Sequence, residues 1–93
     1  MWQTAVFSFF AGIFGANATP HFVKGITKER FPTAFGGSPV INVVVGWLGF
    51  LLAGALAYWA HVDQNPGAAV ICGALGALLL AIFHATIGAF GKP

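Results

Sequence analysis

Residues 67–90 read GAAVICGALGALLLAIFHATIGAF, and this stretch decides the fold. It contains no charged residue and is longer than the roughly 20 residues that a helix needs to cross a bilayer. Small residues recur at every fourth position, which places them along one side of a helix. They are Ala69, Gly73, Ala77, Ala81, Ala85 and Ala89. In lipid, a stripe of small residues allows a second helix to approach closely, so we expect a transmembrane helix that packs through this stripe.

One ionisable side chain, His84, interrupts this apolar run. On a helical wheel it falls within the small-residue stripe, near Ala77, Ala81 and Gly88. We therefore expect His84 to face a packing partner and not the lipid.

The composition agrees with a membrane protein. The chain has 93 residues, of which 58% are hydrophobic and 6% charged, and its mean hydropathy is +0.86. Soluble domains carry about 25% charged residues, so we predict one all-α, integral membrane domain over residues 1–93. The net charge is only +2 and no basic run is present, which argues against a nucleic-acid partner. The single cysteine, Cys72, has no metal-ligand spacing around it and is interpreted as a small buried apolar residue.

Two further apolar stretches predict two more spans, at about residues 2–18 and 39–60, and the third span covers about 67–90. A signal peptide is the alternative for residues 2–18, because Ala16-Asn17-Ala18 resembles a cleavage site. The stretch lacks the positive n-region of a signal peptide, which favours a retained helix. Small residues at four-residue spacing predict packing faces on both helices. These are Ser8, Gly12 and Ala16 in the first span, and Gly49, Ala53 and Ala57 in the second.

Cap-and-proline pairs mark the starts of helices. Ser38-Pro39 and Asn65-Pro66 predict the starts of the second and third spans. Thr19-Pro20 predicts the start of a separate short helix that Gly25 would end. The segment 19–38 mixes phenylalanines with cations, which predicts a short interfacial segment on the membrane surface, with a solvated loop as the alternative.

The cations predict the orientation. Lys24, Lys28 and Arg30 form the membrane-surface basic group in the first connection, and Lys92 is at the C-terminus. With three spans these two regions lie on the same side, which the positive-inside rule makes cytoplasmic. The N-terminus and Asp63 are then outside.

A short motif, Asn17-x-x-Pro20-His21-Phe22-x-x-Gly25-Ile26, stands out from the apolar background. Together with 30–33 and 38–42, it resembles a group of small, uncharacterised bacterial inner-membrane proteins with three predicted spans. The resemblance covers about residues 15–50. It implies a multi-pass protein of the bacterial inner (cytoplasmic) membrane and no particular reaction.

Topology brings four polar residues to similar depth. Asn17 and His21 lie at the inner end of the first span, Asn42 at the inner start of the second, and His84 near the inner end of the third. Polar groups within a membrane need partners and are candidate functional sites. We therefore predict an intramembrane polar cluster of these four residues, whose simplest role is hydrogen bonding between helices.

These features favour a non-enzymatic packing subunit of a membrane assembly. Its partners would be lipid and either other membrane subunits or its own copies, joined through Gly49, Ala53, Ala57, Gly73, Ala77 and Ala81. No catalytic nucleophile is placed beside a histidine and an acid, and no metal site or resident cofactor is expected.

Two alternatives remain open. One is a homo-oligomeric channel or carrier for protons or a small polar solute, with the polar cluster at its inner mouth. The other is a cofactor-holding subunit, in which His84, with or without His21, ligates haem or another tetrapyrrole.

Overall fold

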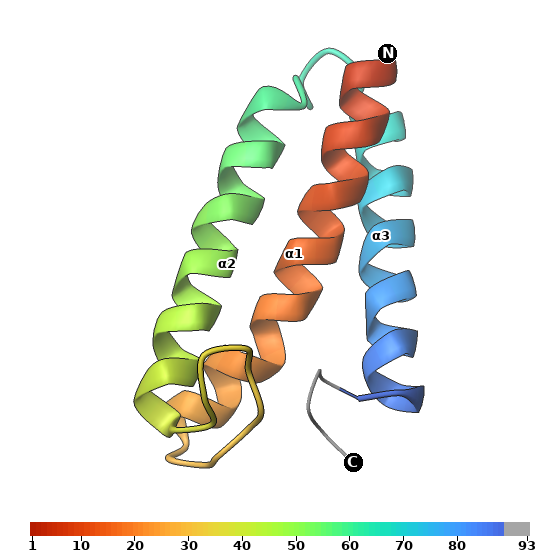
Figure 1. The fold of residues 1–93 in the computed structure, drawn as a ribbon. Helices are drawn as coiled ribbons and strands as arrows, with labels where there is room; N and C mark the ends of the chain where they lie inside the picture. Colours follow the sequence, from red (N-terminus) through yellow and green to blue (C-terminus); the bar gives the residue numbers. More distant parts are fainter. Residues whose placement is uncertain (89–93) are drawn as a thin grey trace.

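The structure, a computed structural model, describes residues 1–88 and shows three α-helices (Figure 1). They are α1 (Trp2–Ile26), α2 (Pro39–Trp59) and α3 (Pro66–Thr86). Each is long and apolar enough to cross a membrane, and no strand occurs in the described residues. The prediction of an all-α protein with three candidate membrane spans is therefore confirmed, and the chain is a small multi-pass membrane protein.

Helix α1 is the centre of the arrangement. It lies between the other two helices and packs against both, whereas α2 and α3 make no contact with each other within residues 1–88 (Figure 1). All helix–helix packing in the described part of the chain therefore depends on the two sides of α1.

The α1–α3 contact relies on glycine. A Cβ atom placed on Gly12 would overlap the carbonyl oxygen of Gly73, and one placed on Gly76 would overlap the carbonyl oxygen of Phe9. No side chain fits in either position while the backbones are this close. The lack of a Cβ is what permits the approach, as in other membrane helix pairs.

The α1–α2 contact also depends on glycine, at several positions along the two helices. A Cβ on Gly46 would lie 2.7 Å from the backbone nitrogen of Phe22, and one on Gly49 would lie 2.8 Å from the Cβ of Ala18. Gly15 and Ala53 meet nearer the other end of the two helices. A Cβ on Gly15 would lie 3.8 Å from the Cβ of Ala53, which is an ordinary van der Waals contact.

The predicted break in the first span is wrong. Helix α1 continues past residue 18 to Ile26, with Pro20 inside it, so no separate short helix begins at Thr19. The Thr19 hydroxyl is not an N-cap and donates to the carbonyl oxygen of Gly15, 2.8 Å away. The local signal was overridden by packing, because Phe22 and Gly25 lie against α2.

Gly25 does not end the helix either. A Cβ on Gly25 would lie 2.6 Å from the backbone nitrogen of Val43, so this glycine serves the contact with α2. The end of α1 comes later, where Lys28 adopts a left-handed conformation with φ of 64°. The backbone N–H of Lys28 bonds to the carbonyl of Gly25, and that of Glu29 to the carbonyl of Lys24. This is the hydrogen-bond pattern of a Schellman motif.

The other helix starts are confirmed. Ser38 is the N-cap of α2, and its hydroxyl accepts the backbone N–H of Ile41 at 3.2 Å. Asn65 precedes Pro66 at the start of α3, but its side chain makes no capping bond. Helix α3 ends at Thr86, four residues before the predicted end at 90. Residues 89–93, including Lys92, lie outside the described residues.

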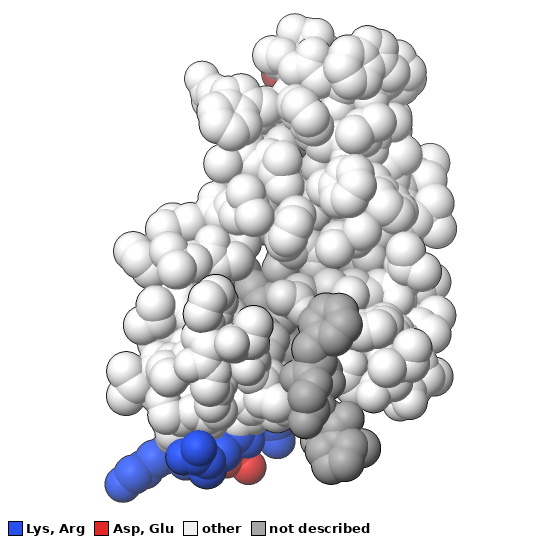
Figure 2. All heavy atoms as spheres, viewed as in Figure 1, with Lys and Arg blue, Asp and Glu red and all other residues white. Residues whose placement is uncertain are grey.

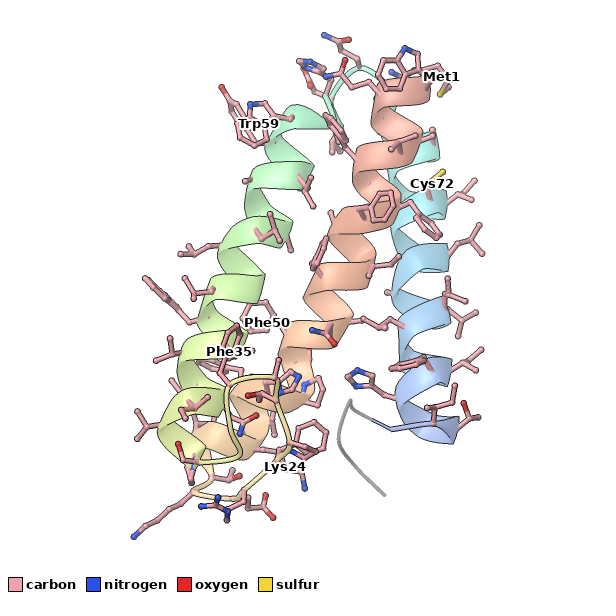
Figure 3. All side chains as sticks on the ribbon, viewed as in Figure 1. Met1, Lys24, Phe35, Phe50, Trp59 and Cys72 are labelled. Carbon is pink, nitrogen blue, oxygen red and sulfur yellow. The ribbon has the colours of Figure 1, made fainter. Side chains whose placement is uncertain are left out.

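Residues 27–38 connect α1 to α2 through turns, without a helix. The proposed interfacial segment is therefore shorter than predicted, because 19–26 belong to α1, and its position on a membrane surface stays a prediction. Lys24, Lys28 and Arg30 gather at this end of the molecule, and the long apolar wall above them carries no such charge on the face in Figure 2. Figure 3 shows Lys24 at this end, with Met1 and Trp59 at the other.

The glycine contacts predict a difference between two alanine substitutions. Gly12→Ala should lower the free energy of unfolding in detergent by about 1–3 kcal/mol, because the added methyl overlaps the α3 backbone. Gly54→Ala is the matched control, since nothing lies within 4 Å of that position. Equal stability of the two variants would contradict the close α1–α3 contact.

Candidate functional site

The four polar residues of the predicted cluster come together at the end of the molecule that carries the cations. Asn17 and His21 lie one turn apart on α1, Asn42 lies near the start of α2, and His84 lies in the last turn of α3. His21 pairs with Asn42 at 2.8 Å, and Asn17 pairs with His84 at 3.1 Å. Each pair joins α1 to a different neighbour, so α1 connects the whole cluster.

Asn42 has the most hydrogen bonds of the four residues, and these bonds fix the orientation of its side chain. It is fully buried, and its Nδ2 donates to the carbonyl oxygens of Phe31 at 2.7 Å and Ser38 at 3.0 Å. These two acceptors set the orientation of the amide, so its Oδ1 faces Nδ1 of His21. Because Oδ1 can only accept, Nδ1 of His21 carries a proton and donates it. The connection 27–38 is held to α2 by the same side chain.

His84 is held by a similar bond. Its Nε2 lies 3.1 Å from Oδ1 of Asn17, so in this amide orientation Nε2 carries the proton. Each histidine therefore uses one ring nitrogen as a donor to an asparagine oxygen. In the neutral ring, the other nitrogen has a free lone pair.

The two imidazoles face one cavity. Their ring centroids are 6.4 Å apart and their planes are nearly perpendicular, at 89°. They line a cavity of about 450 Å³ together with Asn17 and Thr33. The remaining lining residues are apolar and come from the connection and from α2 and α3: Pro32, Ala34, Phe35, Val45, Leu80 and Phe83. Phe35, in the connection, is labelled in Figure 3.

His84 also lines a second, more open groove of about 820 Å³ between α1 and α3. Small side chains make much of its wall. They are Ala16 on α1 and Ala77, Ala81 and Ala85 on α3. Lys24 lies at the groove as well, and its ammonium is 3.8 Å from a carboxylate oxygen of Glu29.

The predicted packing residues fall into two groups. Gly49 and Ala53 lie against α1 from α2, and Gly73 and Ala77 lie against α1 from α3. These four residues therefore contact α1 within the chain and are half-buried, and their contact with other subunits stays a prediction. Ala57 is half-buried and Ala81 is exposed.

A second polar cluster, which the sequence analysis did not predict, joins the three helices at the end of the molecule opposite the cations. The hydroxyl of Thr4 donates to the carbonyl oxygen of Ala60 at 2.5 Å and accepts from Nδ2 of Asn65 at 3.2 Å. Gln3 donates from Nε2 to the carbonyl oxygen of Trp59 at 2.7 Å. The sequence did contain a signal for this cluster. Gln3 and Thr4 are polar residues in the first turn of an apolar helix, and such groups need hydrogen-bond partners near lipid.

No group of three or more His, Cys, Asp or Glu residues is placed to hold a metal ion within residues 1–88. The polar cluster thus offers two histidines and no third ligand of these types. Comparison of the chain with protein-family models, with curated proteins and with solved structures gives no match.

The bonds of Asn42 predict how the connection responds to mutation. Asn42→Ala leaves the Phe31 and Ser38 carbonyls and Nδ1 of His21 without this partner, at about 1–3 kcal/mol for each buried group that stays unpaired. Amide hydrogen exchange of residues 31–38 should accelerate. Asn17→Ala is the control, because it removes a single bond that does not involve the connection. Equal exchange in both variants would argue against this role of Asn42.

Proposed function

We propose that this protein is a non-enzymatic packing subunit of a membrane assembly, and that it receives a transmembrane helix of a neighbouring subunit in the groove between α1 and α3. The observation that carries the proposal is the division of the small-residue stripe on α3. Gly73 and Ala77 are in contact with α1, whereas Ala81 and Ala85 are exposed and line the open groove.

The chemistry of the groove supports a helix as its occupant. Small residues on both walls let a backbone approach closely, which is the main attraction available between helices in lipid. The lining is almost entirely apolar, with Thr19, Lys24 and His84 as its polar members. A helix that fills the groove would give Ala81 and Ala85 the same close contact that Gly73 already makes.

Conduction through one protomer has less support. Residues 9–16, 43–57 and 67–83, which form the middle of the three helices, carry only Trp47 and Cys72 as side chains with a polar or sulfur atom. A proton or solute path needs polar groups or water along its length. The polar cluster at one end and the Thr4 cluster at the other are separated by this apolar stretch.

The orientation is part of the proposal. We infer a bacterial inner-membrane location with the C-terminus in the cytoplasm, supported by the gathering of Lys24, Lys28 and Arg30 at one end (Figure 2). Asp63 lies in the turn between α2 and α3, at the opposite end.

Crosslinking within the native membrane tests the groove. A photoreactive residue at Ala81 should give a discrete protein adduct, because this position lines the groove. The same residue at Leu79, which is exposed on α3 outside the groove, should label lipid. The mass of the adduct tells a second copy from a foreign subunit. Lipid adducts alone from both positions would refute the proposal.

Thiol labelling tests the orientation. In a Cys72→Ala background, a membrane-impermeant thiol reagent added to spheroplasts should modify Asp63→Cys and leave Lys28→Cys unmodified until the membrane is opened. The two positions lie in the connections at opposite ends of α2. The reverse pattern would place the basic end outside.

A further inference from the structure

The two histidines of the polar cluster lie close enough for their charges to interact. The ring centroids of His21 and His84 are 6.4 Å apart. His21 is buried and His84 is half-buried, so water and salt screen charges on these rings less than they screen charges at an exposed site. With an effective dielectric constant of about 20–40, repulsion between two imidazolium ions at this distance lowers the population of the doubly charged arrangement by about 10- to 100-fold.

The asparagine bonds do not prevent protonation of either ring. Oδ1 of Asn42 accepts from His21, and Oδ1 of Asn17 accepts from His84. An amide oxygen accepts from a neutral imidazole and from an imidazolium ion alike, so each bond survives when its ring gains a proton. The cluster can therefore hold one imidazolium ion with both bonds in place, and repulsion begins only with the second proton.

No acidic side chain is free to offset a second charge. The chain contains two acidic residues, Glu29 and Asp63. Asp63 lies in the turn at the opposite end of the molecule. The carboxylate of Glu29 accepts from the hydroxyl of Thr27 at 2.9 Å and lies 3.8 Å from the ammonium of Lys24.

The other ionisable groups around the pair are cations or lie elsewhere. Helix α1 and the connection contribute three cations at this end: Lys24, Lys28 and Arg30. The one ionisable side chain of α2 is Tyr58, near the opposite end of that helix, and α3 carries only Cys72 besides His84. A second imidazolium ion therefore adds positive charge where cations already outnumber the single carboxylate.

Helix α3 has room to move at this end. The backbones of α1 and α3 are in close contact at Gly12 and at Gly76. Beyond these contacts the two helices diverge toward the cation end (Figure 1), where Ala81 and Ala85 are exposed in the open groove. His84 lies in the last turn of α3. A tilt of α3 about the glycine contacts would thus separate the two rings without breaking the close backbone contact.

We propose that His21 and His84 form a pH-sensitive switch of the spacing between α1 and the C-terminal part of α3. With one proton or none on the two rings, the Asn17–His84 bond holds the helices together. With a proton on both rings, repulsion breaks this bond and tilts the end of α3 away from α1. Acidification therefore widens the groove. The effect on a helix seated there rests on the proposed function, whereas the change in spacing does not.

Pulsed electron paramagnetic resonance tests the switch on the full-length protein in lipid nanodiscs, without a partner. In a Cys72→Ala background, spin labels at Ile26→Cys on α1 and Ile82→Cys on α3 report the spacing at the cation end, and both positions are exposed. We expect the distance to lengthen by a few ångströms between about pH 8 and about pH 5, the range in which histidines titrate. Labels at Val6→Cys and Val70→Cys, beyond the glycine contacts, are the matched control and should keep a constant distance.

Two single substitutions show whether the histidines act as a pair. His21→Gln and His84→Gln each keep a side chain that can form hydrogen bonds and remove one of the two charges. Each variant should show the same distance at both pH values, because a lone imidazolium ion has no partner to repel. His61→Gln is the control, since His61 is exposed in the turn at the other end, and this variant should still lengthen. Circular dichroism verifies that each variant keeps its helices.

NMR of the imidazole carbons in the same preparations reports whether both rings are charged when the distance changes. Lengthening that begins only when the second ring becomes charged supports the switch. A constant distance, lengthening while one ring is still neutral, or lengthening that persists in either glutamine variant would overturn it. Because no neighbouring helix is present, each of these outcomes is separate from the crosslinking test of the groove.

Discussion

The packing of α1 against two helices at once is the interaction on which the rest of the structure depends. Lipid gives no hydrophobic driving force between helices, so close backbone contact and polar bonds must hold them together. Helix α1 supplies both on each of its sides. Gly12 meets α3, and Ala18 and Gly25 meet α2, so the neighbours need no contact with each other in the described part of the chain.

Polar bonds join α1 to both neighbours at each end of the molecule. Thr4 connects α1 to Ala60 and Asn65 at one end, and the bonds of His21 and Asn17 connect it to α2 and α3 at the other. Glycine contacts fill the apolar stretch between these ends. This division follows from the bilayer, because unpaired polar groups are most costly in its hydrocarbon centre.

The sequence was sufficient for the three spans and for two helix starts. Hydropathy locates the spans because only long apolar helices can cross the lipid. The Ser38-Pro39 and Asn65-Pro66 pairs locate two helix starts, because the start of a helix depends on neighbouring residues in the sequence. The end of α1 could not be located in the same way. Thr19-Pro20 is a local start signal, but the contact of Gly25 with α2 depends on residues far along the chain.

The candidate site shows a similar limit. Depth along each span predicted that Asn17, His21, Asn42 and His84 lie at one level, since depth depends only on counting residues. Their pairing depends on how each helix is rotated about its axis, which periodic small residues on all three helices leave undecided. The same ambiguity concealed the central position of α1 and the contact made by Gly76.

His84 links the cavity and the groove. It lines the cavity that it shares with His21 and also the groove between α1 and α3. A helix seated in that groove would contact the wall that holds the imidazole, and the bond between His84 and Asn17 restrains the spacing of α1 and α3. A helix in the groove would therefore bear on the Asn17–His84 bond, because both depend on the position of α3 relative to α1.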